Sequence, residues 1–390
     1  MPIALFFVFD LAMEWHPVFL VFSSRFDYAR IGRSAGDRSS SIMGVLEIMS
    51  VVAAVDVGSG YVKAISGGLS VDSPRVSFPS VVGEMPAHLR GQFGSSELPV
   101  IEYADRVWLT GQYALEHLRQ HQVANTLDHN WAGSTPWMVL LFRALADMGI
   151  TDGEVHLVTG VPQASYRERW RDIAAALLGE HRAVVHGKKM RVSILRGENM
   201  IMPQAAAGLY YWMAQDAKLR EISDTDGLIG GIDVGTYTTG FAVLRGGRPV
   251  MDLCSGIDVG MSRVASTVGT RIHSRFGLAL DLKESMRMVE NRHKVFLQGQ
   301  LMDLSNDVRL AVEQVVSGPL MNAIYGLWGG DADRMVIGVY GGGAPDFYPF
   351  IKQVFPRAEL VLMDTMGGGR FLPVLGMLTY YAARNHLLGM

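Results

Sequence analysis

The chain has 390 residues, of which 49% are hydrophobic and 19% are charged, and its formal net charge is −3. This composition excludes an intrinsically disordered chain, and the length favours two domains over a single core. The small negative charge offers no basic excess for direct nucleic-acid binding, so a role with DNA would require a partner protein. The one cysteine, Cys254, excludes an intramolecular disulfide and a cysteine-based zinc site, and it fits a reducing cytoplasm.

The first 48 residues differ from the rest of the chain. Their apolar runs at 2–9 and 18–22 are far shorter than the about 20 residues of a membrane span. We expect the folded unit to begin near Met43 or Met49, with residues 1–48 a dispensable, poorly ordered extension or a wrongly assigned leader. A weak amphipathic membrane anchor is the alternative, but the segment lacks the basic face that such anchors carry.

The next region predicts alternating strands and helices. Residues 50–55 form a nearly continuous apolar run, as expected for a strand that is buried on both faces. The run ends in a glycine turn at 56–60, and residues 61–66 are expected to return as the second strand of a hairpin. Further strands are expected at 75–82, 107–110, 155–162 and 192–195, and helices at 137–148, 166–178 and from Pro203 onward.

The second half of the chain restarts this pattern. An apolar run at 227–232 leads into another glycine turn at 233–237, and residues 238–244 are expected to return as a strand. The restart predicts two related domains of the α/β class. Further strands are expected at 334–340 and 360–363, and helices at 262–276, 282–293, 303–327 and 371–388.

The first glycine turn, residues 56–60, reads Asp-Val-Gly-Ser-Gly. Glycine in a tight turn lets backbone N–H groups converge on an anion, and the Ser59 hydroxyl adds a donor. Lys63 could reach phosphate oxygens as a point charge, and Asp56 at the strand end could hold a hydrated Mg²⁺. Taken by itself, such a turn is usually just a hairpin, so this motif alone does not decide the function.

The second glycine turn, residues 233–239, reads Asp-Val-Gly-Thr-Tyr-Thr-Thr and follows another buried strand. Two such hairpins in the two halves of the chain could face each other and clamp a polyphosphate. The letters Asp-Val-Gly recur at 258–260, but there they follow Cys254-Ser255-Gly256 instead of a buried strand, and they precede a predicted helix. We interpret this third copy as a turn and helix start, with a backbone contribution to a nucleotide pocket as the alternative.

A glycine run at 341–343 follows the predicted strand at 335–340. Glycine at the C-terminal end of a strand lets the backbone lie flat against a base or a phosphate. Alone, a triple glycine is only a flexible turn. A second triplet at 367–369 is expected to serve as a hinge or a close packing site.

These motifs together resemble the five signatures of the actin superfamily. Residues 56–63 look like its phosphate 1 motif, the helix opened by Pro203 like connect 1, and residues 233–239 like phosphate 2. Residues 341–344 resemble the adenosine motif, and 364–377 resemble connect 2. The motifs occur in the family order, and the resemblance extends from residue 51 to the C-terminus.

Within the superfamily the chain looks most like the ParM/StbA plasmid-segregation actins and their archaeal relatives. The overall size and the stretch at 200–208 support this branch. One departure concerns the second turn, because ParM-like loops commonly place an aspartate where this chain has Gly240. We still expect the chain to bind nucleotide, and we expect this departure to affect only the hydrolysis rate.

The resemblance implies two ribonuclease-H-like domains that enclose MgATP in a cleft. We expect residues 49–204 and 365–390 to form the first domain and residues 205–364 the second. Asp56 and Asp233 would organise Mg²⁺ through water, and Gln204 would orient the attacking water, so these three are the expected catalytic residues. The expected nucleotide-binding residues are Gly58, Ser59, Gly60, Lys63, Gly235, Thr236, Tyr237, Thr238, Gly341, Gly342, Gly343 and Ala344.

The implied function is that of a cytoplasmic, actin-like ATPase that forms head-to-tail filaments with ATP and depolymerises after hydrolysis. Plasmid segregation through a DNA-binding adaptor is the implied cellular role. Two alternatives remain open: a small-molecule kinase of the same superfamily and a membrane-associated scaffold resembling FtsA or PilM. A kinase would need a carboxylate base, for which Glu198 is the nearest residue, and the scaffold would need a terminal amphipathic helix, which residues 380–390 do not offer.

Overall fold

The computed structural model describes residues 51–67, 73–89, 100–197, 200–290, 294–297, 299–364 and 368–385. The expected extension at 1–48, Glu198, Gly367 and the ends of two predicted helices lie outside these ranges. Within them the chain is a mixed α/β protein built on two large sheets, so the predicted fold class is confirmed.

The first sheet has ten strands in the order β3-β2-β1-β7-β9-β8-β5-β6-β4, with β10 pairing with β7. Its strands are β1 (Val51–Val57), β2 (Tyr61–Ser66), β3 (Arg75–Pro79), β4 (Val82–Glu84), β5 (Val100–Tyr103), β6 (Arg106–Thr110), β7 (Asp152–Val161), β8 (Gly179–Val185), β9 (Lys188–Ile194) and β10 (Ile201–Pro203).

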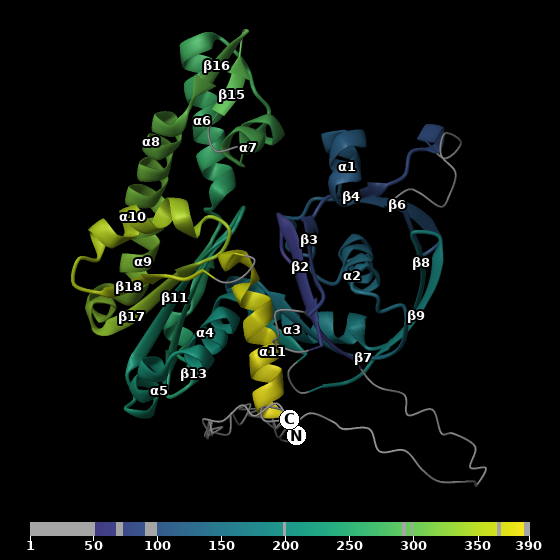
Figure 1. Cartoon of the computed structure of the whole chain (residues 1–390), viewed down its shortest axis with the longest axis horizontal. Helices are drawn as coiled ribbons and strands as arrows, with labels where there is room; N and C mark the ends of the chain where they lie inside the picture. The colour runs from purple at the N-terminus through teal and green to yellow at the C-terminus, as the bar shows by residue number, and fades with distance from the viewer. Residues whose placement is uncertain are drawn as a thin grey trace, which may run out of the picture.

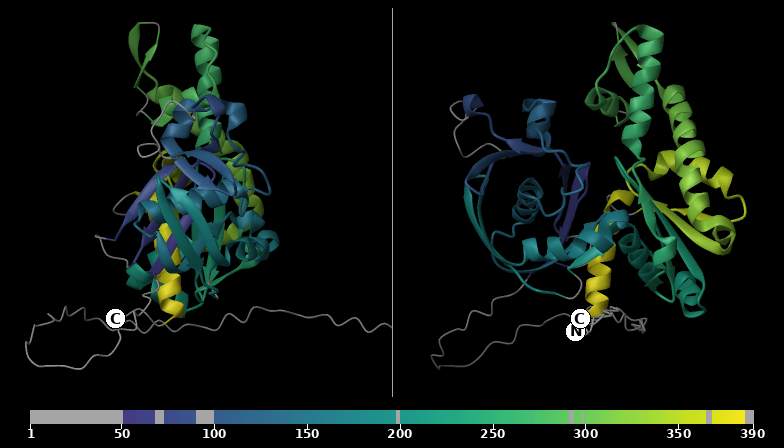
Figure 2. Two further views of the ribbon diagram at one scale, coloured as in Figure 1. Left: turned by 90° about the vertical axis from the view of Figure 1, so that its right-hand side faces the viewer. Right: turned by 180° about the vertical axis from the view of Figure 1, so that it is seen from behind.

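The first sheet curls around helix α2 (Thr135–Asp147), as Figures 1 and 2 show. Ser134 caps this helix by accepting from the backbone N–H of Trp137, and a proline occupies the first turn. Every residue from Trp137 to Phe142 is buried, because the curled sheet covers the helix on several sides. Helices α1 (Gly111–His117) and α3 (Tyr166–Leu177) flank this half.

The second sheet has the order β13-β12-β11-β17-β18, with β14 pairing with β12. Its strands are β11 (Leu228–Val234), β12 (Thr239–Arg245), β13 (Arg248–Pro249), β14 (Ser255–Ile257), β17 (Met335–Tyr340) and β18 (Glu359–Leu362). Its helices are α6 (Met261–Phe276), α7 (Leu282–Glu290), α8 (Ser305–Val315), α9 (Met321–Trp328) and α10 (Ala344–Val354). A separate hairpin, β15 (Lys294–Leu297) and β16 (Gln300–Asp303), joins α7 to α8.

The two sheets repeat one local arrangement, which confirms the restart seen in the sequence. In the first half β1 pairs antiparallel with β2 and parallel with β7. In the second half β11 pairs antiparallel with β12 and parallel with β17. Each glycine turn therefore lies at the C-terminal end of a central strand, the edge of a sheet at which α/β folds bind ligands.

Two helices fill the space between the sheets (Figure 1). Helix α4 (Gln204–Gln215) packs on β11 and β12, and α11 (Leu372–Arg384) packs on β1 and β7. The helices touch at Gly376, where an added Cβ atom would lie 1.7 Å from the carbonyl oxygen of Ala207. Only glycine permits this approach. The shorter helix α5 (Ala217–Asp224) follows α4. The domain boundary expected at 204–205 stays a prediction.

Some expected elements differ in the structure. The helix predicted at 303–327 is divided into α8 and α9 by a π-helical turn at Val316–Leu320, because Pro319 inside it cannot donate a helical hydrogen bond. The sequence also gave no signal for β5, β8 or the β15–β16 hairpin, whose mixed residues lack a sustained apolar alternation.

Candidate functional site

A cavity of about 870 Å³ lies between the two halves of the molecule. Its walls include both glycine turns, the glycine run that follows β17, the start of α4 and one side of α7. The sequence-predicted residues that line it are Asp56, Gly58, Ser59, Gly60, Lys63, Gln204, Asp233, Gly235, Thr236, Thr238, Gly341, Gly342 and Gly343.

Two predicted site residues do not line this cavity. Ala344 is the first residue of α10 and is only 1% exposed, so it belongs to the packed core. Tyr237 lies in the second turn but its partly buried phenol is not in the cavity wall, and burial raises the pKa of this phenol. The residues on either side of it, Thr236 and Thr238, line the cavity instead.

The two glycine turns touch each other. A Cβ atom added to Gly60 would lie 2.1 Å from the Oγ1 atom of Thr236, which is closer than any real contact. A Cβ atom added to Gly58 would lie 3.0 Å from Nζ of Lys63. Only glycine at 60 lets the two turns pack this closely, whereas a Cβ atom at 58 would be in tight contact with the end of the Lys63 side chain and with the backbone oxygen of Tyr61.

Asp56 is the centre of a polar cluster on the first turn. It is the penultimate residue of β1, and only 2% of its surface is exposed. The Lys63 ammonium lies 2.6 Å from Asp56 Oδ2, and the Gln204 amide donates to Asp56 Oδ1 at 2.5 Å. The cluster places a cation and a helix-start amide beside one carboxylate, although Gln204 is 148 residues away in sequence.

Asp233 occupies the equivalent position on the second turn, in β11. Burial raises the pKa of its carboxyl group to about 7, and the charge of Asp56 adds to this effect while Lys63 opposes it. Among the described residues none forms an ion pair or a side-chain hydrogen bond with Asp233. Asp233 is half-buried in β11, and a desolvated carboxylate without such a partner is a suitable ligand for a cation.

Gly240 lies directly opposite Asp233 in the β11–β12 ladder. Residues that oppose each other in an antiparallel pair project to the same face, so an aspartate at 240 would add a second carboxylate beside Asp233. A Cβ atom at 240 would lie 3.0 Å from the Cβ of Ala205, so glycine also lets α4 pack closely.

The glycine run after β17 forms the third wall. Gly341 has a φ of 96°, and an added Cβ would lie 2.4 Å from the carbonyl oxygen of Val234. The Gly343 N–H donates to that same carbonyl at 3.0 Å. Nothing lies within 4 Å of a Cβ added to Gly342, which faces open space in the cavity. The run thus presents bare backbone to a ligand.

The third Asp-Val-Gly copy supports the second turn. It precedes α6, as the sequence predicts, and the first N–H groups of that helix bond the turn: Met261 N donates to Gly235 O at 3.2 Å and Ser262 N to Thr236 O at 2.7 Å. Asp258 also lines the cavity. The helix start therefore fixes the turn that carries the cavity wall.

Two family models match the chain over most of the described region. Residues 54–206 match the N-terminal domain of actin-like proteins, and residues 231–353 match the C-terminal domain of the MreB-like archaeal actin homologues. The chain belongs to the actin-like proteins. A search of curated proteins gives no significant match to this actin-like chain.

Solved structures share the fold of this actin-like chain. Ta0583, an archaeal actin homolog, has a TM-score of 0.71 and 20% identity, over 86% of this chain and 99% of that chain. A ParM from Clostridium botulinum, solved as a 15-stranded filament, has a TM-score of 0.67 and 23% identity, over 86% and 99%. Ta0583 was also solved in complex with ADP, with a TM-score of 0.69 and 19% identity over 86% and 99%.

The actin-like chain also forms contacts across the cavity that its sequence does not reveal. The Tyr61 hydroxyl donates to Glu290 Oε1 on α7 at 3.1 Å, and the Arg370 guanidinium lies 5.6 Å from the Tyr61 ring centre. Burial and the adjacent Glu290 carboxylate raise the pKa of Tyr61 to about 12. On the same helix, the Lys283 ammonium donates to the backbone oxygen of Leu115. Helix α7 is thus tied to the opposite half.

Two further residues were missed by sequence reasoning. Gln163 and Trp131 line the cavity and are 7% and 8% exposed. Neither the Gln163 amide nor the Trp131 indole N–H has a hydrogen-bond partner among the described residues. Buried polar atoms of this kind are normally satisfied by water or by a ligand. The wall beside the first sheet is therefore polar as well.

Within the part of the chain that the structure describes, no helix combines the length and apolar character needed to cross a bilayer. The same residues include no group of three or more His, Cys, Asp or Glu side chains placed to hold a metal ion.

Proposed function

We propose that this actin-like chain binds MgATP in the cavity, hydrolyses it slowly and forms nucleotide-dependent filaments. The single observation that carries the proposal is the pair of facing turns, with the Asp56–Lys63–Gln204 cluster on one side and Asp233 on the other. A polyphosphate needs backbone N–H groups, a cation and a metal ligand in one place. This cavity offers all three.

The phosphates are assigned to the first turn and its lysine. Backbone N–H groups of Gly58 and Gly60, the Ser59 hydroxyl and the Lys63 ammonium would bind the β- and γ-phosphates. Thr236 and Thr238 would contact them from the opposite turn. The bare backbone at 341–343 would contact the adenosine.

Asp56 and Asp233 are the residues that would hold Mg²⁺ through water. Magnesium is commonly held by one or two carboxylates plus the phosphates of the substrate, which fits the two carboxylates present. When bound, the ion neutralises charge that develops on the transferred phosphoryl group. Its charge would also favour ionised Asp233, whose pKa is raised to about 7 in the protein alone.

Gln204 is the residue proposed to orient the attacking water. It is the first residue of α4, so its amide is fixed by a helix that packs on the second sheet. Its Nε2 group donates to Asp56, which leaves its amide oxygen to accept a hydrogen bond from a water. We expect Gln204→Ala to lower the hydrolysis rate about 100-fold while MgATP affinity changes less than about threefold.

Filament formation is supported by the fold and by the C. botulinum ParM that was solved as a filament. A head-to-tail contact that does not close generates a helical filament, and nucleotide hydrolysis can bias such contacts through domain closure. Membership of the ParM branch, a cytoplasmic setting and plasmid segregation through a DNA-binding adaptor are parts of the same proposal.

Right-angle light scattering and pelleting with MgATP test the proposal. We expect scattering that rises with MgATP, is absent with EDTA, and falls after the ATP is consumed. Asp233→Ala serves as the control that should neither bind MgATP nor scatter. An ATPase that never pellets at high concentration contradicts the filament, and turnover that requires an added sugar or acid would favour a small-molecule kinase instead.

A further inference from the structure

The charged side chains that line the cavity are mostly negative. The described residues of the lining include Lys63 and Arg370 as side chains with a permanent positive charge. They also include six carboxylates: Asp56, Asp128, Asp233, Asp258, Glu290 and Asp346. The Lys63 ammonium lies 2.6 Å from Asp56 Oδ2, so its charge is already compensated. A polyanion that enters this cavity is therefore repelled unless further cations contribute, and Arg370 is the remaining cation of the described lining.

Arg370 has no carboxylate partner in the part of the chain that the structure describes. Among these residues none forms an ion pair with its guanidinium or accepts a hydrogen bond from it, and the side chain is exposed. The guanidinium carbon lies 5.6 Å from the centre of the Tyr61 ring. Burial and Glu290 raise the pKa of Tyr61 to about 12, and the charge of Arg370 acts against this rise. The guanidinium is therefore close to the phenol and free of a compensating charge.

Tyr61 contacts both Glu290 and Arg370, in different ways. Its hydroxyl donates to Glu290 Oε1 at 3.1 Å, so the phenol already satisfies the carboxylate that lines the cavity from α7. Its ring lies beside the guanidinium. The attraction between a cation and an aromatic ring is weak at an exposed site, and it uses none of the N–H donors of the guanidinium. These donors stay available to an anionic ligand.

The backbone around Arg370 is held on both sides. Arg370 lies in the short 3-10 turn that precedes α11. Within this turn the Phe371 N–H donates to the carbonyl oxygen of Gly368 at 3.1 Å, and Phe371 is 8% exposed. The Gly369 carbonyl accepts from the Gly341 N–H at 3.3 Å. The turn therefore fixes the Arg370 backbone, while the exposed side chain lines the cavity.

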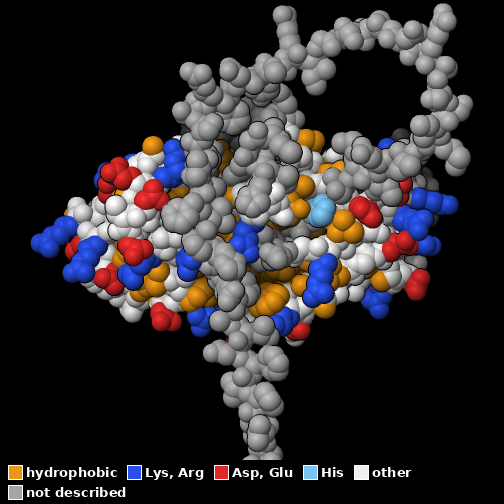
Figure 3. Space-filling model, turned by 90° about the horizontal axis from the view of Figure 1, so that it is seen from below, with side chains coloured by type: hydrophobic (Ala, Val, Ile, Leu, Met, Phe, Trp, Pro, Cys, Tyr) orange, Lys and Arg blue, Asp and Glu red, His pale blue; other side chains and the backbone are white. Residues whose placement is uncertain are grey.

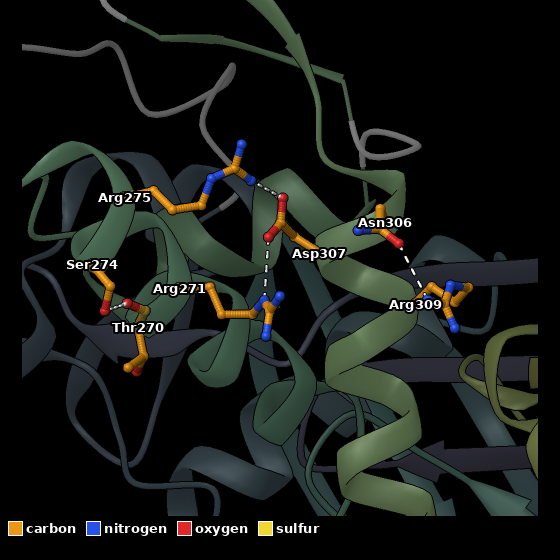
Figure 4. Close-up of polar contacts among 7 residues, drawn as sticks. All are labelled: Thr270, Arg271, Ser274, Arg275, Asn306, Asp307 and Arg309. Carbon is orange, nitrogen blue, oxygen red and sulfur yellow. Dashed lines mark hydrogen bonds and ion pairs between the residues drawn. The ribbon is translucent and has the colours of Figure 1, made fainter.

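Arginines elsewhere in the molecule are differently placed. On α6, Arg271 and Arg275 bind the buried Asp307 at 3.2 Å and 2.5 Å (Figure 4). In the view from below, positive side chains lie among negative and apolar ones (Figure 3). Arg370 differs because its charge faces a cavity and lacks a carboxylate partner among the described residues.

The turn that carries Arg370 lies between the two walls that the proposed function assigns to the nucleotide. On one side its backbone bonds Gly341, the first residue of the glycine run assigned to the adenosine. On the other side the Arg370 side chain lies beside Tyr61, which directly follows the turn assigned to the β- and γ-phosphates. A nucleoside triphosphate carries its α-phosphate between its nucleoside and its terminal phosphates. The α-phosphate is therefore the anion that comes within reach of Arg370.

We propose that Arg370 binds the α-phosphate of the nucleotide. The inference rests on the proposed function, because it takes the adenosine and the terminal phosphates to lie where that function assigns them. Arginine suits this role because its guanidinium carries a fixed charge and a fork of N–H donors that matches phosphate oxygens. Residue 370 lies outside the ranges 54–206 and 231–353 that the family models match. Because ATP and ADP share the α-phosphate, the contact holds substrate and product alike.

Competition binding tests which phosphate Arg370 contacts. ATP, ADP, AMP and adenosine are used to displace a fluorescent ADP analogue from the full-length wild type and from Arg370→Ala. We expect the substitution to weaken the binding of ATP, ADP and AMP by the same factor, about tenfold, because each carries the α-phosphate. Adenosine, which has no phosphate, should bind the two proteins equally within about twofold.

Three outcomes of this competition overturn the proposal. Weakening confined to ATP, or to ATP and ADP, indicates a contact with the terminal phosphates. Equal weakening of adenosine indicates a contact with the base or the ribose. Unchanged binding of all four compounds shows that Arg370 contacts no part of the nucleotide.

Two further variants separate a phosphate contact from a structural role. Arg370→Lys keeps the charge and loses the fork of donors, so AMP should bind it only about threefold more weakly than the wild type. Arg357→Ala removes another exposed arginine, one outside the cavity lining, and should leave the binding of all four compounds unchanged. The thermal unfolding midpoint of ligand-free Arg370→Ala should equal that of the wild type, because the side chain is exposed. A lowered midpoint together with weaker adenosine binding would show that Arg370 only holds its turn, which overturns the proposal.

Failure of this inference is distinguishable from failure of the proposed function. A wild type that binds and pellets with MgATP, beside an Arg370→Ala chain that binds AMP equally well, contradicts the inference alone. A wild type that shows the expected competition pattern but never pellets contradicts the proposed filament and supports the inference. A wild type that binds none of the four compounds contradicts both.

Discussion

The two glycine turns share a backbone design and differ in electrostatics. Each follows a central strand, pairs with a returning strand and ends at the same cavity. On the first turn the buried Asp56 is compensated by Lys63 and Gln204. On the second turn the pKa of Asp233 is raised to about 7 because that carboxylate is buried near another carboxylate. The same backbone turn thus carries an ion-paired carboxylate in the first half and, in the second half, a carboxylate without an ion-pair partner that is suited to bind a cation.

The largest expected effect comes from removing the Lys63 charge, which compensates the Asp56 carboxylate on the first turn. Lys63→Ala leaves Asp56 buried beside Asp233 with no cation. We expect the free energy of unfolding to fall by about 3 kcal/mol and ATP affinity to fall at least 100-fold. Urea unfolding and calorimetric titration measure these changes.

A matched control is the exposed ion pair of Arg182 and Glu180, which lies 2.7 Å apart on the surface. Arg182→Ala should change the free energy of unfolding by less than about 0.5 kcal/mol, because exposed pairs are screened by water. Equal effects of the two substitutions would contradict the special role of Lys63.

On the second turn, removal of the Asp233 charge should raise the free energy of unfolding instead of lowering it. The pKa of Asp233 is raised from its ordinary 3.8 to about 7, so the folded state binds this proton more tightly than the unfolded state. The stabilising contribution of the proton is present below about pH 4 and is lost as the pH rises through 7. In EDTA at pH 8, Asp233→Asn should therefore raise the free energy of unfolding by about 1–3 kcal/mol, while MgATP binding is lost.

Unfolding measured from pH 4 to pH 8 in EDTA checks this prediction. The difference between the wild type and Asp233→Asn should grow as the pH rises. A difference that shrinks or stays constant would show that Asp233 is not a strained carboxylate. Asp258→Asn, on a cavity residue outside the two turns, is the comparison for a general effect of charge removal.

The contact between the turns predicts a smaller effect. Gly60→Ala forces a Cβ against Thr236, whereas Gly342→Ala meets nothing within 4 Å. We expect Gly60→Ala to weaken ATP binding about tenfold and to lower the free energy of unfolding by about 1–3 kcal/mol. Gly342→Ala should change the free energy of unfolding by under about 0.5 kcal/mol. Reversal of this order, measured by titration and melting, would mean that the turns separate in solution.

The smallest expected effect concerns the contact across the cavity. Tyr61→Phe removes the hydrogen bond to Glu290 and keeps the ring beside Arg370. We expect the release rate of a fluorescent ATP analogue to rise about two- to fivefold, as the loss of one hydrogen bond of about 1 kcal/mol implies. Because the pKa of Tyr61 is raised to about 12, its hydroxyl stays protonated between pH 7 and pH 9. Titration of Tyr61 should therefore not change the wild-type release rate over this range. Stopped-flow release measured at both pH values decides between these outcomes.

Local patterns in the sequence predicted much of the fold. Both hairpins, the strand before the glycine run and the start of α6 were found from short apolar runs and glycine turns, since their hydrogen bonds close within a few residues. Most of the expected site residues line the cavity for the same reason. Tyr237 and Ala344 do not, because the direction of a side chain in a turn and the start of a helix depend on neighbouring elements.

The amino-acid sequence by itself determined the two turns, their carboxylates and the family signatures in their order. Only the tertiary structure decided that Gln204 reaches Asp56, that Tyr61 reaches Glu290 across the cavity, and that Phe296 and Leu301 face outward. The physical reason is that pairing between distant segments, burial and the resulting pKa of Asp233 depend on how whole layers pack. A turn needs only its neighbours along the chain, whereas a site needs neighbours in space.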